Sequence, residues 1–179
     1  MEGFQQEQSW FALQVKPRHE IATARMLRNK GLEEFVPTYS SLRQWSDRQK
    51  QVEFPLFSGY IFCKFHPARK LPVITTAGVV RIVGTSCGPA SIAEHEIDSI
   101  RRAVESGQKV QPHPYIAEGS KVRVKNGPMA GIEGIFVGYK NRSEMIISVD
   151  LLQRSISLQI KGYAIAVTEQ THSAPRYVA

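Results

Sequence analysis

The stretch Gly119-Ser-Lys-Val-Arg-Val-Lys-Asn-Gly-Pro-Met-Ala-Gly-Ile-Glu-Gly134 determines the fold of the C-terminal part of the chain. Val122 and Val124 alternate with three basic residues, a spacing that places the valines on the buried face of a strand and the cations on the other face. Gly127 and Pro128 then favour a tight turn, and the later glycines allow positive φ angles or a close approach of two strands. The stretch therefore predicts a strand, a turn and a second strand of a small antiparallel barrel.

The residues that follow continue this β-rich pattern. Short runs rich in β-branched and aromatic residues are separated by glycine, proline, asparagine and serine, which is typical of small barrels. These runs are residues 132–139, 145–149, 155–160 and 164–167. We therefore expect an SH3-like β-barrel over residues 119–168, followed by a C-terminal tail at residues 169–179.

The residues before the barrel have a different organisation. Residues 107–118 contain Gln-Pro-His-Pro and follow neither a helical nor a strand period, so they predict an extended linker. Upstream of them, strongly apolar strands alternate with helical patterns. The strands are expected at residues 10–16, 59–65 and 79–83, and the clearest helix at residues 18–30. The order favours a ferredoxin-like antiparallel sheet with helices over residues 9–106, and hence an α+β protein of two domains.

Composition and charge narrow the class of protein. The chain has 179 residues, 42% of them hydrophobic, so it has enough apolar residues to fold and shows no segment typical of disorder. No apolar run approaches the ~20 residues that cross a bilayer, and the first residues lack a cationic, apolar secretion signal, so we expect a cytoplasmic protein. A net charge of +7 favours an acidic partner, most commonly nucleic acid.

Catalysis, a cofactor and a bound metal are not expected. Cys63 and His66 are three residues apart on a predicted strand, so they point to opposite faces, and no acidic residue nearby would orient the histidine. The second cysteine, Cys87, makes no metal-binding pair with the first, and the five histidines lack metal spacing. Neither a P-loop nor a GxGxxG sequence occurs. These patterns indicate a binding protein.

Residues 119–134 resemble the KOW motif, and the N-terminal half supplies a second, independent resemblance. Four segments precede the motif: Trp-Phe-Ala-Leu-Gln-Val-Lys at residues 10–16, Glu-Glu-Phe-Val-Pro at 33–37, Pro-Leu-Phe-Ser-Gly-Tyr-Ile-Phe at 55–62 and Gly-Val-Val-Arg-Ile-Val-Gly at 78–84. Their order is similar to that of the NusG N-terminal domain. Residues 9–168 together therefore resemble the NusG family of transcription elongation and antitermination factors.

The resemblance implies that the N-terminal domain docks on the clamp helices of bacterial RNA polymerase and bridges the DNA cleft. The family uses the aromatic strand after an FPGY-like turn for docking, which here implies a polymerase-binding set. The set consists of Trp10, Phe57, Tyr60, Phe62 and Ile82. A surplus of aromatics is typical of interface hot spots, whereas the alternative is that they pack in the core. Strict alternation would place Phe57 on the face of Ile61 and Phe65, and Tyr60 with Phe62 on the other face.

Two segments imply further partners. The turn formed by Asn126, Gly127, Pro128 and Met129 corresponds to the part of the KOW domain that contacts Rho or a small-subunit ribosomal protein in housekeeping NusG, where a phenylalanine stands in place of Met129. A methionine still offers an adaptable apolar contact. Ser58 stands where the family commonly has proline. This departure loosens the turn but leaves Gly59 and Tyr60 in place. Residues 44–50, ahead of Pro55-Leu-Phe57, look more like those of specialised NusG paralogues that act as operon-specific antiterminators. We expect the protein to act as a monomer.

The polar segment between residues 43 and 50 predicts an exposed tip between two strands. Arg43, Arg48 and Lys50 supply cations for phosphate and Trp45 supplies a plane for a base, so the tip has the composition of a site for single-stranded nucleic acid. The alternative is a solvated loop with Trp45 folded back on the sheet. For the whole chain, the alternative function is a ribosome-associated or RNA-binding KOW protein.

Overall fold

The computed structural model describes residues 8–45, 48–115, 119–139, 142–160 and 165–169. Its internal contacts divide the chain into two compact units, Met1–Glu94 and His95–Ala179, which we call unit 1 and unit 2. Both units contain antiparallel sheets and few helices, so the expected α+β class is confirmed. None of the helices in the described part of the chain is long and apolar enough to cross a membrane.

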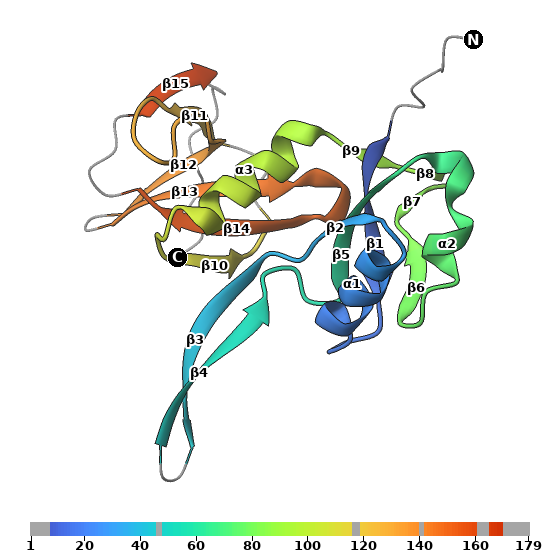
Figure 1. Ribbon diagram of the computed structural model, residues 1–179. Helices are drawn as coiled ribbons and strands as arrows, with labels where there is room; N and C mark the ends of the chain where they lie inside the picture. Colours follow the sequence, from blue (N-terminus) through green and yellow to red (C-terminus); the bar gives the residue numbers. More distant parts are fainter. Residues whose placement is uncertain (1–7, 46–47, 116–118, 140–141, 161–164, 170–179) are drawn as a thin grey trace. The chain divides into compact units, whose positions relative to one another are not determined.

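Unit 1 is built on an antiparallel sheet with the strand order β2-β5-β1-β6, and a short strand, β9, also pairs with β1 (Figure 1). The sheet strands are β1 (Ser9–Val15), β2 (Glu33–Phe35), β5 (Tyr60–Phe65), β6 (Val79–Ile82) and β9 (Ser91–Ile92). The helices of the unit are α1 (Glu20–Asn29), η1 (Pro67–Arg69) and α2 (Leu71–Ile74), and β7 (Gly84–Thr85) pairs with β8 (Gly88–Pro89).

One face of this sheet packs against α1 and α2. Alternate residues of β1 and β5 point to this face, as the period of a strand requires. The resulting core consists of Phe11, Leu13 and Val15 of β1, Ile61, Cys63 and Phe65 of β5, Ala24 and Leu27 of α1, and Val73 of α2. The rings of Phe11 and Phe65 lie 4.6 Å apart between centroids. This cluster explains why β1 and β5, two of the three strands predicted as strongly apolar, lie at the centre of the sheet, whereas the third, β6, lies at its edge.

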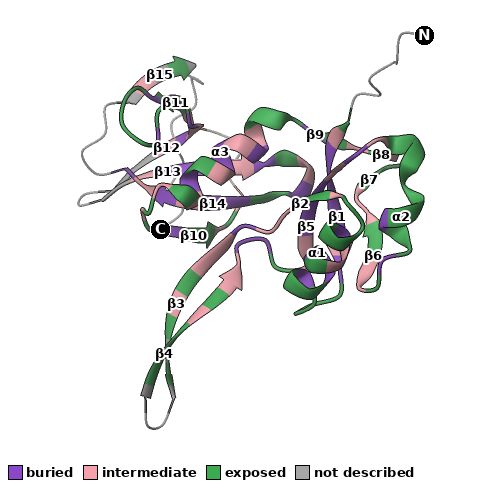
Figure 2. Ribbon diagram, in the orientation of Figure 1, coloured by how far each residue is buried: buried purple, intermediate pink, exposed green. Residues whose placement is uncertain are grey.

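The predicted tip between two strands is the end of a long hairpin. Strands β3 (Thr38–Trp45) and β4 (Arg48–Pro55) pair with each other over their whole length and form a separate two-stranded sheet. The hairpin extends away from the main sheet of unit 1, and most of its described residues are exposed or half-buried (Figure 2). Its shape therefore matches the exposed excursion expected from the sequence.

Unit 2 contains a six-stranded sheet with the order β10-β14-β13-β12-β11-β15, together with nearly all of helix α3 (Glu94–Glu105). Its strands are β10 (Val110–His113), β11 (Ser120–Val124), β12 (Glu133–Tyr139), β13 (Arg142–Val149), β14 (Arg154–Gln159) and β15 (Ile165–Glu169), with the short helix η2 (Asp150–Leu152) before β14. Val122 and Val124 are buried, and the basic residues that alternate with them, Lys121, Arg123 and Lys125, are exposed, so the alternation expected in the motif segment holds.

The structure differs from the sequence prediction at residues 107–118. This segment was expected to be an extended linker, but it contains β10, which pairs with β14 from Val110 to His113. Its proline, Pro112, is tolerated because β10 is an edge strand of the sheet.

The boundary between the two units also differs from the prediction. The contacts divide the chain after Glu94 and not near residue 106, because α3 packs with the barrel strands. Arg102 of α3 donates a hydrogen bond to the carbonyl of Ala130 at 3.0 Å.

Candidate functional site

The second face of the unit 1 sheet carries most of the residues predicted to bind a protein partner. In the β1–β5 register, Trp10 lies opposite Lys64, Ala12 opposite Phe62, and Gln14 opposite Tyr60. These positions alternate with the core residues that pack against α1 and α2, so they belong to the opposite face. Lys64 lies 5.8 Å from the centre of the Trp10 ring, close enough for a cation–π contact.

Three members of the predicted polymerase-binding set are buried. Trp10, Phe57 and Phe62 are at most 2% exposed. Phe57 packs edge-on against Phe62 with ring centroids 5.3 Å apart, and Phe35 lies 6.2 Å from Phe62. These three side chains therefore pack in the core, which was the alternative to a place at the interface. The expectation that alternation places Phe57 with Ile61 is wrong, because a turn separates Phe57 from β5 and interrupts the period.

Two members of the set retain exposed surface, and they do not share a face. Tyr60 is half-buried on the second face of the sheet. Ile82 is half-buried at the other edge and packs against the core that includes α1. The structure therefore brings Tyr60 together with Phe57 and Phe62 but places Ile82 apart from them. Of the predicted set, Tyr60 is therefore the side chain that keeps exposed surface on the second face.

A buried carboxylate fixes the turn that positions Tyr60. Gly59 has a φ angle of +82°, and its N–H donates to Oε1 of Glu20 in the first turn of α1 at 2.7 Å. The carbonyl of Gly59 accepts from the N–H of Val15 at 2.9 Å, and Tyr60 N–H donates to the carbonyl of Phe57 at 3.0 Å. The sequence indicated only that Glu20 suits the positive end of the helix. Its link to Gly59 depends on tertiary contact and has no local signal.

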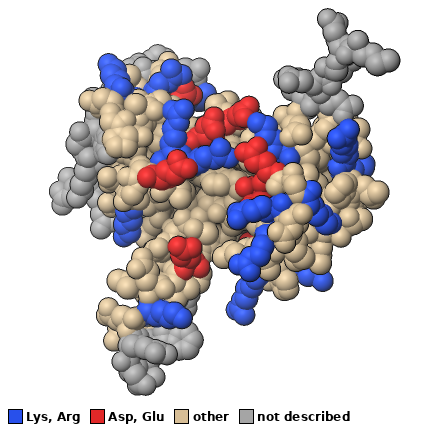
Figure 3. All heavy atoms as spheres, viewed as in Figure 1, with Lys and Arg blue, Asp and Glu red and all other residues tan. Residues whose placement is uncertain are grey.

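The hairpin register brings the four predicted nucleic-acid residues together in pairs. Arg43 lies opposite Lys50, and Trp45 lies opposite Arg48. Lys50 is exposed; the side chains of the other three are outside the described part of the structure. In the view of Figure 3, basic side chains are interspersed with acidic ones rather than gathered in one patch. The cations of the hairpin are therefore brought together by the pairing of its two strands, and they do not belong to a larger basic patch in this view.

The predicted partner-binding turn of the barrel is only partly accessible. Asn126, Gly127 and Pro128 are exposed, and Gly127 has the positive φ angle, 79°, that the motif implied. Met129, however, is fully buried. The turn folds inward there, with Ala130 N–H donating to the carbonyl of Gly127 at 3.0 Å. The expectation that Met129 offers an apolar contact is therefore not met in this conformation.

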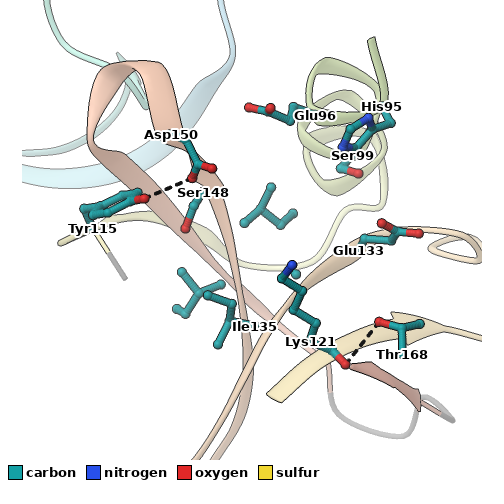
Figure 4. A pocket seen from close by; sticks show the side chains of 13 residues that line it. His95, Glu96, Ser99, Tyr115, Lys121, Glu133, Ile135, Ser148, Asp150 and Thr168 are labelled. Atoms are coloured by element: carbon teal, nitrogen blue, oxygen red, sulfur yellow. Dashed lines mark hydrogen bonds between the residues drawn. The ribbon is translucent and has the colours of Figure 1, made fainter. Parts of the chain in front are cut away.

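A cavity of about 310 Å³ in unit 2 was not predicted from the sequence (Figure 4). Helix α3 contributes His95, Glu96 and Ser99 to its lining, and Tyr115 donates from its hydroxyl to Asp150 Oδ1 at 3.0 Å on another side. Burial raises the pKa of the Glu96 carboxyl, and the charge of Asp150 raises it further. The residues that line the cavity come from separate elements that are far apart in the sequence, so no local sequence pattern predicts the cavity.

The residues considered for catalysis have an inert environment. Burial, with smaller contributions from Glu34 and Glu33, raises the pKa of the Cys63 thiol to about 12, so the thiol is protonated at neutral pH and cannot act as a nucleophile. Cys87 is exposed in the β7–β8 hairpin. Among the described residues, no three His, Cys, Asp or Glu side chains are grouped to hold a metal ion.

Comparison with known proteins assigns a family to this arrangement. Residues 8–101 match the family model described as transcription termination factor NusG. The chain is 27% identical over 168 residues to the transcription termination/antitermination protein NusG of Campylobacter jejuni, covering 84% of this chain and 92% of that protein. It is 26% identical to the protein of the same name from Pseudomonas aeruginosa, covering 85% and 94% respectively.

A solved structure shares the fold. The structure titled "Domain interaction in Thermotoga maritima NusG" matches with a TM-score of 0.52 at 16% identity, covering 91% of this chain and 98% of that one. The family match includes the sheet that carries Tyr60, the hairpin and most of α3. The chain belongs to the NusG family and is a NusG-like transcription termination/antitermination factor.

Proposed function

We propose that this protein is a transcription elongation factor that binds the clamp of bacterial RNA polymerase through the second face of the unit 1 sheet, around Tyr60. It suppresses pausing or termination there, in the cytoplasm, while its barrel recruits a second partner. One observation supports the docking face above all others: Tyr60, which keeps exposed surface, lies between Phe57 and Phe62 in the sequence, and the rings of these two residues are buried and pack against each other.

The turn before Tyr60 is preorganised for docking. Phe57 and Phe62 are buried and pack edge to face on either side of the turn in the sequence, and Glu20 accepts a hydrogen bond from the N–H of Gly59, which has a left-handed conformation. Tyr60 therefore loses little conformational freedom when a partner covers it, and it has both a large apolar ring and a hydroxyl. Rigid, central aromatics of this kind dominate the binding energy of many protein interfaces. The buried rings act as its support, which gives them an indirect part in docking.

The other partners follow from the hairpin and the barrel. The paired cations and Trp45 of the hairpin contact transcribed DNA in the elongation complex, since cations neutralise phosphate and aromatic planes stack on bases. The exposed part of the barrel turn, Asn126, Gly127 and Pro128, contacts Rho or a small-subunit ribosomal protein. Because Met129 is buried, this contact uses the polar and backbone groups of the turn or requires the turn to rearrange.

We further propose that the protein is a specialised NusG paralogue that acts as an antiterminator on particular operons. Ser58 occupies the turn position where proline is common in the family, and Met129 replaces the phenylalanine of housekeeping NusG. Identities of 26–27% to curated NusG proteins leave room for such divergence.

Binding of the full chain to purified bacterial core RNA polymerase tests the docking face. Loss of a buried hot-spot aromatic is worth ~2 kcal/mol or more, so Tyr60→Ala will bind at least ~30-fold more weakly than the wild type. Ile21→Ala is the control, because Ile21 is an apolar side chain on α1 that is 50% exposed and lies outside the second face of the sheet. Equal binding by wild type and Tyr60→Ala would move the interface to another face.

A parallel measurement of RNA binding distinguishes the elongation factor from the alternative function. A ribosome-associated or RNA-binding KOW protein would bind RNA tightly without polymerase. Lys121, Arg123 and Lys125 are exposed on the barrel, so such binding has a chemical basis. Tight RNA binding together with no polymerase binding would favour that alternative over the elongation factor.

A further inference from the structure

The cavity in unit 2 is lined by helix α3 on one side and by barrel strands on the others (Figure 4). Its volume, about 310 Å³, lies near the lower end of the ~300–1,000 Å³ range of small-ligand pockets. The exposed barrel turn at residues 126–129 does not line it, and the docking face and the hairpin belong to unit 1. The cavity is therefore separate from the surfaces that the proposed function uses.

Ser99 places an unpartnered hydroxyl in the wall of this cavity. It is 6% exposed and lies in the middle of α3, where a serine hydroxyl often bonds to the backbone carbonyl one turn earlier. Ser99 makes no such bond, and its hydroxyl has no other partner in the described part of the chain. The described side-chain oxygens and nitrogens that are fully enclosed all have partners, so the Ser99 oxygen must reach the open space of the cavity. It is therefore available to a ligand there.

The charged groups around the cavity are mostly acidic. Glu96, Glu133 and Asp150 supply three carboxylates, whereas Lys121 supplies one ammonium group. Glu133 forms an ion pair with Arg123, which does not line the cavity. Neither Glu96 nor Asp150 forms an ion pair in the described part of the chain. Two carboxylates therefore face the cavity without a cation of their own, which favours a positively charged ligand.

These two carboxylates also influence each other. Burial raises the pKa of the Glu96 carboxyl, the charge of Asp150 raises it further, and His95 lowers it. Tyr115 donates a hydrogen bond to Asp150 at 3.0 Å, but a neutral hydroxyl does not remove the negative charge. A cation near both groups would favour the ionised form of each carboxyl.

We propose that this cavity binds the guanidinium group of an arginine side chain from a partner polypeptide. A guanidinium is planar and has five N–H donors and no acceptor, which suits a wall of carboxylate and hydroxyl oxygens. An ammonium has three donors and is more strongly hydrated, so it is the weaker ligand of the two. The apolar part of the lining, Ile135, Ile146 and Ile147, contacts the aliphatic stem of the arginine. Free arginine is disfavoured, because its own carboxylate would approach Glu96 and Asp150.

Nuclear magnetic resonance titrations of the isotope-labelled full chain test the proposal, with capped amino acids as probes. Nα-acetyl-arginine amide will shift the resonances of residues that line the cavity, including the backbone amide of Ser99. The corresponding citrulline probe, which has a neutral urea in place of the guanidinium, will bind at least ~10-fold more weakly, because the charge-assisted hydrogen bonds are lost. Capped lysine and free arginine will also bind more weakly than capped arginine.

Two variants and a control assign the binding to the named groups. Glu96→Gln removes one carboxylate with little change in shape and will weaken the binding of capped arginine by ~10-fold or more. Ser99→Ala removes the hydroxyl, keeps a good helix former and will weaken binding by ~2-fold to ~10-fold. Glu105→Gln is the matched control, because Glu105 is an exposed residue of the same helix outside the lining of the cavity. This variant will bind capped arginine like the wild type.

Each part of the proposal has an outcome that overturns it. The absence of shifts at cavity residues with every probe, or equal binding of capped arginine by Glu96→Gln and Glu105→Gln, would overturn the site. Equal binding of the arginine and citrulline probes would overturn the need for a cation. Equal or stronger binding of capped lysine would overturn the guanidinium, and equal or stronger binding of free arginine would overturn the polypeptide source. The titrations contain no polymerase, so their results do not depend on the docking proposal.

Discussion

Removing the Glu20 carboxylate will loosen the turn that presents Tyr60. Glu20 is 3% exposed, and its Oε1 accepts from Gly59 N–H at 2.7 Å. A hydrogen bond to a charged group contributes ~1.5–3 kcal/mol, and the negative charge near the start of α1 adds ~0.3–1 kcal/mol. Gly59 is half-buried, so water can satisfy part of its lost bond. We therefore expect Glu20→Ala to destabilise this region by ~2 kcal/mol.

Hydrogen exchange measured by mass spectrometry gives a local readout of this change. A loss of ~2 kcal/mol corresponds to ~30-fold faster exchange for amides that open with the turn. The peptide covering residues 59–65 will show this acceleration, whereas peptides from the barrel strands of unit 2 will exchange as in the wild type. Polymerase affinity will fall together with the protection of this peptide, because Tyr60 loses its fixed position.

Arg25→Ala is the matched control, because Arg25 is an exposed residue on the same helix. Surface substitutions of this kind usually change stability by no more than ~0.5 kcal/mol. If Glu20→Ala and Arg25→Ala exchange at the same rate at residues 59–65, the carboxylate does not hold the turn. The support of Tyr60 would then come from the aromatic rings alone.

Three further predictions concern other parts of the chain. Gly134→Ala will destabilise unit 2 by ~1–3 kcal/mol in urea denaturation, because an added Cβ would lie 2.4 Å from the backbone oxygen of Ile146; an unchanged midpoint would show that the strands can separate without cost. A thiol reagent will modify Cys87 in the folded protein but not Cys63, whose thiol is buried and has a pKa of about 12, and rapid modification of both would contradict this environment. Because the pKa of Glu96 is raised above its ordinary value of 4.5, the folded state retains this proton more strongly than the unfolded state, and unit 2 loses stability as pH rises from that value through the folded pKa. Glu96→Gln will therefore be more stable than the wild type at pH 7, and a pH-independent difference between the two in thermal unfolding would argue against the titration.

Alternation and turn chemistry were sufficient to predict the elements that dominate the fold. The valines of the motif segment are buried as their spacing required, and the hairpin forms where polar residues separate two β-rich runs. The prediction failed where backbone pairing overrode local composition. Residues 110–113 have two polar side chains and a proline, yet they pair with β14 because that strand presents an open edge.

The candidate site was less predictable than the fold, because its key contacts join residues far apart in sequence. Phe57 shares a face with Phe62 only because the turn at Gly59 breaks the alternation between them. Glu20 reaches the same turn across 39 residues of sequence. Met129 is buried although its motif position implied exposure. The alternation of side chains along a strand contains no information on such contacts. Tyr60 and the cations of the hairpin stay predictions, the former from the family resemblance and the latter from residue type.

The independence of the hairpin has a consequence for how such proteins can diversify. Within the described residues, β3 and β4 pair with each other and with no strand of the main sheet. Substitutions near the tip therefore change a recognition surface without passing strain into the core that contains Phe11 and Phe65. Duplicated copies of the chain can then change the hairpin while the main sheet, with the proposed docking face, stays constant, so that the two surfaces can evolve separately within one unit.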